Sequence, residues 1–131
     1  MNVFISHSFE DQRYAAELAK SLSSHGVSAF SASDVVAGED MAKAVEKALR
    51  KSDATVFLMG PQNSQNPNLY FELGAAFSLG KLILPVITEE MKGRPLPMPL
   101  MAQQFIVRRS PAATAGVIAD ALHMHPKALA S

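Results

Sequence analysis

One carboxylate stands alone in a long uncharged part of the chain. Glu72 is the only charged residue among positions 54–80, and it lies within the apolar run NLYFELGAAFSLGKLILPVI, residues 68–87. On a helix it would share a face with Leu69, three residues before it, and with Ala76, four residues after it. Placing an acid on an apolar face costs free energy unless the acid has a partner or a function. Glu72 is therefore the first candidate for chemistry.

Other side chains that could contact a ligand lie in three short segments. These candidates are Ser6, His7, Phe30, Asp34, Asn66 and Asn68. The aromatic ring could stack on a planar base, and the histidine could donate or accept a hydrogen bond. Each type also has a simpler explanation: strand-end aromatics often pack in the core, loop histidines often fill a structural hydrogen bond, and loop carboxylates are often solvated. No metal site is expected, because cysteine is absent and the pair His123 and His125 has no third ligand.

Length and composition indicate one globular domain. The chain has 131 residues, of which 48% are hydrophobic and 18% are charged, so it can bury a core. Twelve Lys and Arg balance twelve Asp and Glu, so no overall charge attracts nucleic acid or an anionic membrane surface. No apolar stretch is long enough to span a membrane, and the lack of cysteine agrees with a reducing compartment. We expect a soluble cytoplasmic protein.

Short apolar runs alternate with helix signals. The predicted strands are Val3–Ser6, Val27–Ser31, Ala54–Met59, Leu82–Ile87 and Gln104–Val107. The helix signals are a Ser8–Asp11 capping box, Glu39 and Asp40 in a first turn, a helix over about Leu69–Leu79, and an N-cap and N1 pair at Ser110 and Pro111. Pro85 removes a ladder donor from the fourth strand, which predicts a sheet margin or a bulge there. Residues 1–125 are expected to form the domain, and 126–131 a frayed tail or the start of a linker.

This alternation favours an α/β fold, with a five-stranded, mostly parallel sheet and helices on both faces. For the strand order 2-1-3-4-5, ligands bind beyond the carboxyl ends of the strands, between the first and third. The loops that meet there are 6–8 and 60–68, with 30–38 beside them. Glu72 would lie one turn into the helix that leaves the second of these loops. The glycine-rich turns and phosphate loops of common nucleotide-binding proteins are absent.

Three blocks of the sequence resemble Toll/interleukin-1 receptor (TIR) domains of bacteria. The blocks are VFISHSFEDQRYAAELAKSLSSHG, SASDVVAGEDM and NPNLYFELGAAFSLGKLILPVI, in that order, and they spread over nearly the whole chain. The resemblance implies a flavodoxin-like fold. Many bacterial and plant members of this family cleave NAD+ at the bond between nicotinamide and ribose. The resemblance therefore also implies this activity, with NAD+ as a substrate and no separate cofactor.

The resemblance also assigns roles to individual positions. The catalytic glutamate of the family falls on Glu72, and the loop that gates the site and mediates contacts between domains matches residues 31–40, including Val35, Val36 and Gly38. Asn66 and Asn68 stand where many active members have Ser or Cys. Ala37 precedes that loop's glycine where others have proline.

A single carboxylate is chemically sufficient for this reaction. Ordinary glycosidases use two, one of which protonates a poor leaving group. Nicotinamide in NAD+ is already a cationic pyridinium and departs neutral, so one carboxylate can orient the ribose hydroxyls and stabilise an oxocarbenium-like charge. The leading hypothesis is an NAD+ glycohydrolase or a related cyclase, activated by self-association, with a fused or associated sensor and a role in antiphage defence. The alternatives are a nucleoside 2-deoxyribosyltransferase, whose glutamate also precedes a GAAFSLGK-like segment, and a non-catalytic module for homotypic assembly.

Overall fold

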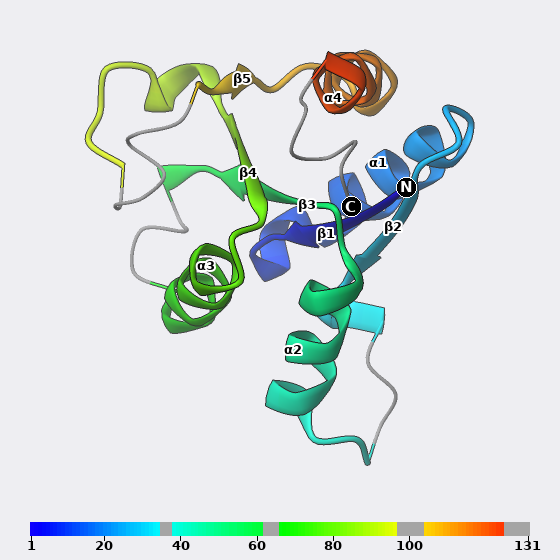
Figure 1. Cartoon of the computed structure of the whole chain (residues 1–131). Coiled ribbons are helices and arrows are strands. Elements are labelled where there is room, and N and C mark those ends of the chain that lie inside the picture. The colour runs from blue at the N-terminus through cyan, green and yellow to red at the C-terminus, as the bar shows by residue number, and fades with distance from the viewer. Residues whose placement is uncertain (35–37, 62–65, 97–103, 125–131) are drawn as a thin grey trace.

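The computed structural model describes residues 1–34, 38–61, 66–96 and 104–124. Its centre is one parallel sheet of five strands in the order β2-β1-β3-β4-β5. Figure 1 shows this sheet with its helices on both sides. The strands are β1 (Asn2–Ser6), β2 (Ser28–Ser31), β3 (Ala54–Met59), β4 (Leu82–Ile87) and β5 (Ile106–Val107). The predicted fold class and strand order are confirmed.

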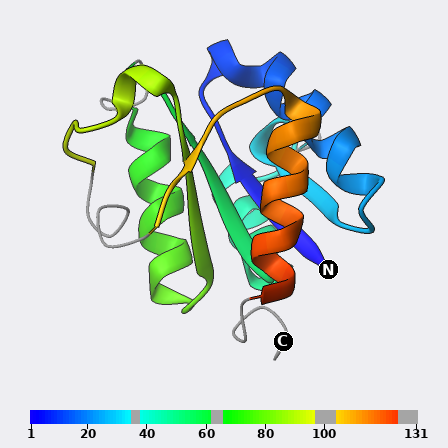
Figure 2. The ribbon, with the colours of Figure 1, turned by 90° about the horizontal axis from the view of Figure 1, so that it is seen from above.

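Four α-helices cover the two faces. They are α1 (Gln12–Ser23), α2 (Met41–Lys51), α3 (Pro67–Ser78) and α4 (Pro111–Met124). One apolar cluster joins the sheet to α1 and α4, through side chains such as Leu18 and Ile118. A second joins the opposite face to α2 and α3, through Leu49 and Leu73. The view from above in Figure 2 shows these two layers on either side of the sheet.

The central strands are buried on both faces, which explains their continuous apolar sequence. Every residue of β3 and β4 is buried. The two strands pair in register from Ala54 with Leu82 to Met59 with Ile87. Because parallel strands with covered faces need apolar side chains at every position, their limits could be predicted to the residue.

Pro85 lies inside the sheet, without a bulge. The N–H of Thr88 donates to Met59 of β3, and the carbonyl of Ile87 accepts from Arg108, just beyond β5. Hydrogen-bonding directions alternate along a strand, so the nitrogen of Pro85 faces the β5 side. On that side the first residue of β5, Ile106, pairs with Val86, so β5 has no residue opposite Pro85. The proline therefore removes no ladder bond: of the two predicted alternatives, a margin or a bulge, the structure has no bulge, and the nitrogen of Pro85 faces a local margin of the sheet.

Several element ends differ from prediction. The last strand is shorter than predicted, with two residues instead of four. The first helix begins after a 3-10 turn, η1 (Phe9–Asp11), because Ser8 provides no side-chain cap. Asp40 is the N-cap of α2, its Oδ1 accepting from the N–H of Lys43 over 3.1 Å, so Glu39 and Asp40 precede the first helical turn. Local hydrogen bonds of this kind shift helix starts by one or two residues. The tail after Met124 lies outside the described residues.

Candidate active site around Glu72

Glu72 is held inside the protein at the carboxyl end of the sheet. Only 5% of the residue is exposed, on a helix whose buried face also includes Leu69, Leu73 and Ala76. Ser6, the last residue of β1, donates its hydroxyl to Oε1 of Glu72 over 3.3 Å. The other oxygen, Oε2, is buried and has no hydrogen-bond partner among the described residues. The structure thus presents one carboxylate oxygen held by Ser6 and one to which no described residue donates.

Burial changes the acidity of this group. It raises the pKa of Glu72 from 4.5 to about 7, and the hydrogen bond from Ser6 partly opposes that rise. No described Lys or Arg forms an ion pair with the carboxylate. A buried, uncompensated carboxylate is costly, and such groups concentrate at functional sites.

The loop after β1 brings two of the predicted residues to Glu72's end of the sheet. Ser6 is buried and contacts Glu72 directly. His7 is half-buried, and its Nδ1 lies 2.8 Å from the carbonyl oxygen of Ser8. Because a carbonyl can only accept, Nδ1 carries the proton in this contact and donates it to Ser8.

Asn66 and Asn68 lie at the start of α3. Asn66 is its N-cap, and its side-chain oxygen accepts from the N–H of Asn68 over 2.9 Å. Asn68 is exposed and precedes Glu72 by four residues, one helical turn. Asn66 therefore has a structural role that the sequence left unassigned, while Asn68 shares the face of Glu72 near the helix start.

Phe30 and Asp34 lie along β2. The ring of Phe30 is 6.0 Å from that of Phe4, centroid to centroid, and packs against the core cluster beneath α2 and α3. Asp34, at the end of the 3-10 turn η2 (Ala32–Asp34), is exposed, and its Oδ2 accepts from the N–H of Ser31 over 2.9 Å. Gly38 has a φ of +93°, a conformation that suits glycine. Val35 and Val36 of the predicted interaction loop lie outside the described residues.

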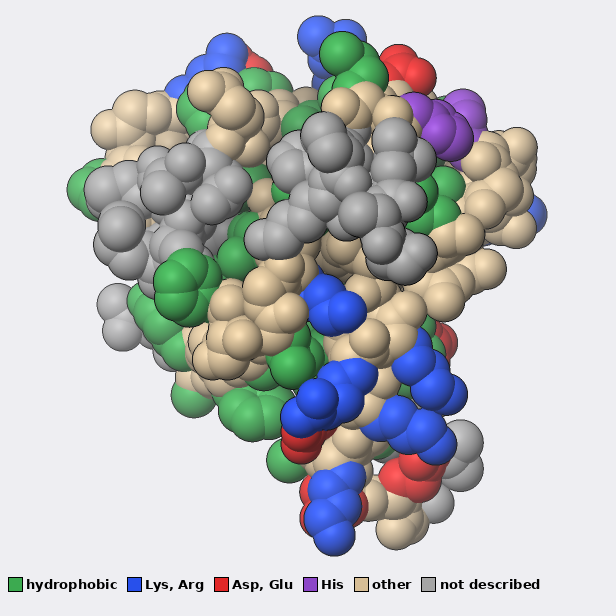
Figure 3. Space-filling model, viewed as in Figure 1, with side chains coloured by type: hydrophobic (Ala, Val, Ile, Leu, Met, Phe, Trp, Pro, Cys, Tyr) green, Lys and Arg blue, Asp and Glu red, His purple; other side chains and the backbone are tan. Residues whose placement is uncertain are grey.

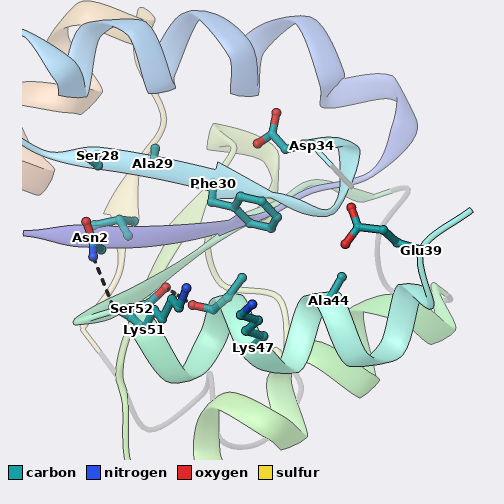
Figure 4. Close-up of a pocket in the computed structure, with 12 residues that line it drawn as sticks. Asn2, Ser28, Ala29, Phe30, Asp34, Glu39, Ala44, Lys47, Lys51 and Ser52 are labelled. Carbon is teal, nitrogen blue, oxygen red and sulfur yellow. Dashed lines mark hydrogen bonds between the residues drawn. The ribbon is translucent and has the colours of Figure 1, made fainter. Parts of the chain in front are cut away.

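Two cavities flank β2, and neither includes Glu72. The first, about 300 Å³, lies between β2 and α2 and is shown in Figure 4. The second, about 270 Å³, lies between β2 and α1. Phe30 and Asp34 line both. We therefore place the candidate site by the chemistry of Glu72 and Ser6, and treat the two cavities as a separate feature.

A polar network that the sequence analysis missed supports the loop after β1. Arg108 donates to Oδ1 of Asp11 over 2.8 Å and stacks over the ring of Tyr14, 3.8 Å from its centroid. Ser8 in turn donates to Oδ2 of Asp11 over 3.4 Å. The partners are 97 residues apart in sequence, so no local pattern could have revealed the pair. Through Asp11, the end of β5 is tied to the segment that follows Ser6.

Comparison with known proteins places the chain in a family. Residues 3–116 match the family model described as TIR domain, and no curated protein matches the chain. The fold is similar to the TIR domain of the Toll-related receptor TRR-2 from Hydra magnipapillata, with a TM-score of 0.66 and 23% identity over 80% of this chain and 82% of that one. It is also similar to a TIR-STING receptor from C. gigas, with a TM-score of 0.74 and 24% identity over 91% of this chain and 39% of that one.

A third similar structure is an enzyme. It is the 2-deoxyribosyltransferase of Bacillus psychrosaccharolyticus, with a TM-score of 0.65 and 15% identity over 88% of this chain and 90% of that one. At these identities the structural similarities show the fold alone. Among the described residues, no helix is both long and apolar enough to cross a membrane. Because the family model covers most of its length, the chain belongs to the TIR domain family.

Proposed function

We propose that this protein cleaves NAD+ between nicotinamide and ribose, with Glu72 as the catalytic carboxylate. The observation that carries the proposal is the buried Glu72, one oxygen of which is held by Ser6 while the other has no partner among the described residues. Membership of the TIR family, which has NAD+-cleaving members, supports it. The reaction yields nicotinamide and ADP-ribose with water as the acceptor, or a cyclic ADP-ribose when a nitrogen of the adenine attacks instead.

The geometry suits a reaction that develops positive charge. As the glycosidic bond breaks, its electron pair leaves with the ring, which becomes neutral nicotinamide, and the ribose becomes oxocarbenium-like. An ionised Glu72 stabilises that charge and accepts hydrogen bonds from the ribose hydroxyls, and it acts most strongly where water is excluded. Ser6, bonded to Oε1, acts as a positioning residue that directs the free oxygen.

The charge of the substrate also favours NAD+ over a neutral nucleoside. Glu72 has a pKa of about 7 because burial penalises its ionised form and no described cation compensates it. A bound pyridinium brings the missing positive charge and lowers the pKa of Glu72 in the complex. A neutral nucleoside brings none.

The test is release of nicotinamide by purified protein, measured by chromatography at high protein concentration. We expect kcat/KM to rise with pH and level off above about 7, as Glu72 ionises in the free enzyme. Glu72→Gln should lower the rate about 10²-fold or more. Glu90→Gln removes an exposed acid elsewhere and should leave the rate unchanged. Equal activity of wild type and Glu72→Gln would contradict the assignment.

A second candidate is transfer of deoxyribose between bases, favoured by the structural similarity to the Bacillus 2-deoxyribosyltransferase. The bond broken is of the same class, but the leaving base is neutral and needs a proton, which a protonated Glu72 would supply. Incubation with a deoxynucleoside and a second free base distinguishes the two. Exchange of bases without nicotinamide release from NAD+ would support the transferase.

Self-association is the remaining part of the proposal. TIR domains typically assemble with one another, and we propose that this chain does so to complete its pocket, with residues 31–40 among the contacts and a fused or associated sensor as the trigger. Bacterial antiphage defence in the cytoplasm is the setting that the family resemblance suggests. If concentration-dependent oligomers form without any nicotinamide release, the protein is an interaction module instead.

A further inference from the structure

The cavity between β2 and α2 is separate from the candidate active site. Its volume is about 300 Å³, at the small end of the range for pockets that bind small molecules. Neither Glu72 nor Ser6 lines it. Its walls come from the start of β1, from β2 and from one side of α2, as Figure 4 shows. A ligand in this cavity would therefore occupy a second site.

The sequence of α2 explains why the cavity exists. Four residues of this helix line it, and they share one helix face because they are three or four positions apart: Ala44, Lys47, Ala48 and Lys51. The neighbouring face carries Val45 and Leu49, which are buried in the second apolar cluster. β2 is the outermost strand of the sheet, so no further strand fills the space beside it. The small alanine side chains leave that space open.

Phe30 gives the cavity an aromatic wall. Its ring projects from β2 toward α2 in Figure 4, and the residue is half-buried. The ring also lies 6.0 Å from the ring of Phe4, centroid to centroid, which holds it against the core. Aromatic rings fixed in this way can stack with a planar ring of a ligand.

Lys47 and Lys51 supply positive charge along the α2 side of the cavity. Both line it and both are exposed. Neither forms an ion pair with a described carboxylate. Figure 3 shows blue Lys and Arg side chains gathered over α2, although the chain as a whole is neutral. Two ammonium groups one helical turn apart can donate to several oxygens of one anion, as phosphate-binding lysines do.

Glu39 places negative charge at one end of the same cavity. It precedes α2, whereas Lys51 is the last residue of that helix. In Figure 4 its carboxylate points toward Phe30. Such a group accepts hydrogen bonds from amino groups and repels anions. Asp34 also lines the cavity, but its Oδ2 already accepts from the N–H of Ser31.

We propose that this cavity binds a nucleoside monophosphate whose base carries an amino group. The phosphate accepts hydrogen bonds from Lys47 and Lys51, the base stacks on Phe30, and its amino group donates to Glu39. Glu39 disfavours an anionic group at its own end, so the ligand carries its negative charge at the other end only. The planar base that the sequence analysis expected Phe30 to contact then lies in this cavity and not beside Glu72.

The first test separates the contributions of the base and the phosphate. Isothermal titration calorimetry at low ionic strength compares adenosine monophosphate (AMP) with adenosine, which lacks the phosphate, and with inorganic phosphate, which lacks the base. AMP should bind about tenfold or more tightly than either, because it alone meets both the aromatic wall and the lysines. Added salt should weaken the binding of AMP.

The second test removes the lysines. Lys47→Gln with Lys51→Gln should weaken the binding of AMP about tenfold or more. Lys43→Gln with Lys92→Gln makes the same change of net charge at exposed positions that do not line the cavity, so it should have little effect.

A third test fills the cavity and leaves the charges in place. Ala44→Leu should abolish the binding of AMP, and the fold should survive because leucine is a good helix former and the site has space for it. Ala42→Leu, at an exposed position of α2 outside the cavity, is the matched control and should bind AMP normally. Circular dichroism checks the fold of both variants.

Because AMP is also part of NAD+, its binding must be located. Glu72→Gln should bind AMP like wild type, and AMP should shift the methyl NMR signals of Ala44 and Ala48. Loss of AMP binding in Glu72→Gln would place AMP at the candidate active site and overturn the inference. Loss of nicotinamide release is a different readout, so the proposed function and this second site can fail separately.

Three other results overturn the inference. One is that AMP, CMP and GMP all fail to bind at millimolar concentration. Another is that AMP binds no more tightly than inorganic phosphate. The third is that the variant without Lys47 and Lys51 binds AMP as tightly as its control.

Discussion

At the scale of the residue, ionisation of the buried Glu72 lowers the stability of the folded protein. Three buried side-chain oxygens among the described residues have no partner, and the other two belong to Thr55 and Thr88, which cannot ionise near neutral pH. Of these three residues, only Glu72 therefore couples its burial to pH. The same burial that makes the ionised form costly makes it effective against a developing positive charge.

We predict that Glu72→Gln stabilises the protein at alkaline pH. The folded pKa of about 7 exceeds the ordinary value of 4.5, so the folded state holds its proton more tightly than the unfolded state. The folding free energy contributed by protonated Glu72 is fully present below about pH 4.5 and is lost as the pH rises through about 7. The folded and ordinary pKa values differ by about 2.5, which corresponds to about 3 kcal/mol of folding free energy at pH 8.

Urea unfolding of wild type and Glu72→Gln measures this difference. The measurements run from pH 5, below the raised pKa of about 7, to pH 8, above it. The variant should gain relative to wild type as pH increases. Glu90→Gln, an exposed control, should follow wild type throughout. A constant difference between Glu72→Gln and wild type across this range contradicts a raised pKa.

At the scale of the element, the junction of β5 and α4 is joined to α1 by polar contacts. Tyr14 donates its hydroxyl proton to the carbonyl of Arg109 over 2.6 Å, and its hydroxyl oxygen lies 2.8 Å from Oγ1 of Thr114 in a second hydrogen bond. Arg108 lies over the same ring and pairs with Asp11. Because β5 pairs over only two residues, these contacts supply much of what holds its end in place.

We predict that Arg108→Met costs about 3 kcal/mol of folding free energy, because it leaves the carboxylate of Asp11 buried without its cation. The side chain of Asp11 is 7% exposed and that of Arg108 is 19% exposed. Arg108→Lys keeps the charge but loses the planar stacking on Tyr14, so we expect an intermediate loss. Arg94→Met, at an exposed position, is the control. Chemical denaturation measures all three, and losses below about 0.5 kcal/mol at Arg108 would show the network to be unimportant.

Element boundaries show where sequence patterns suffice. The limits of β3 and β4 were predicted correctly because both faces demand apolar residues. The start of α1 was not, since the hydroxyl of Ser8 bonds the side chain of Asp11 and leaves the helix start uncapped. Arg108, 97 residues away in sequence, holds the other oxygen of Asp11.

At the scale of the whole molecule, catalysis and assembly are expected to be coupled. Neither cavity beside β2 includes Glu72. Residues 31–40 connect the β2 edge to α2, and α2 shares the second apolar cluster with α3, the helix that carries Glu72. Association through residues 31–40, as proposed above, would therefore act on the segment that the family resemblance assigns to gating. This gives self-association a physical route to the candidate site.

We predict that nicotinamide release per chain increases when the protein is held at high local density. Fusion to an oligomerising coiled coil raises the effective concentration without changing the site. A fusion carrying Glu72→Gln should release nicotinamide about 10²-fold or more slowly than the fused wild type. An equal rate per chain for the fused and the free protein contradicts activation by assembly.

The sequence by itself determined the fold class and the choice of Glu72 as a candidate, because hydrophobic periodicity and an isolated charge are local properties of the chain, whereas the strand order followed from the resemblance to TIR domains. Only the tertiary structure decided that Ser6 holds Glu72 and that Arg108 compensates Asp11. Each of those features joins residues from different elements. Their distances and burial are set when the sheet and its helices pack, and no spacing along the chain encodes them.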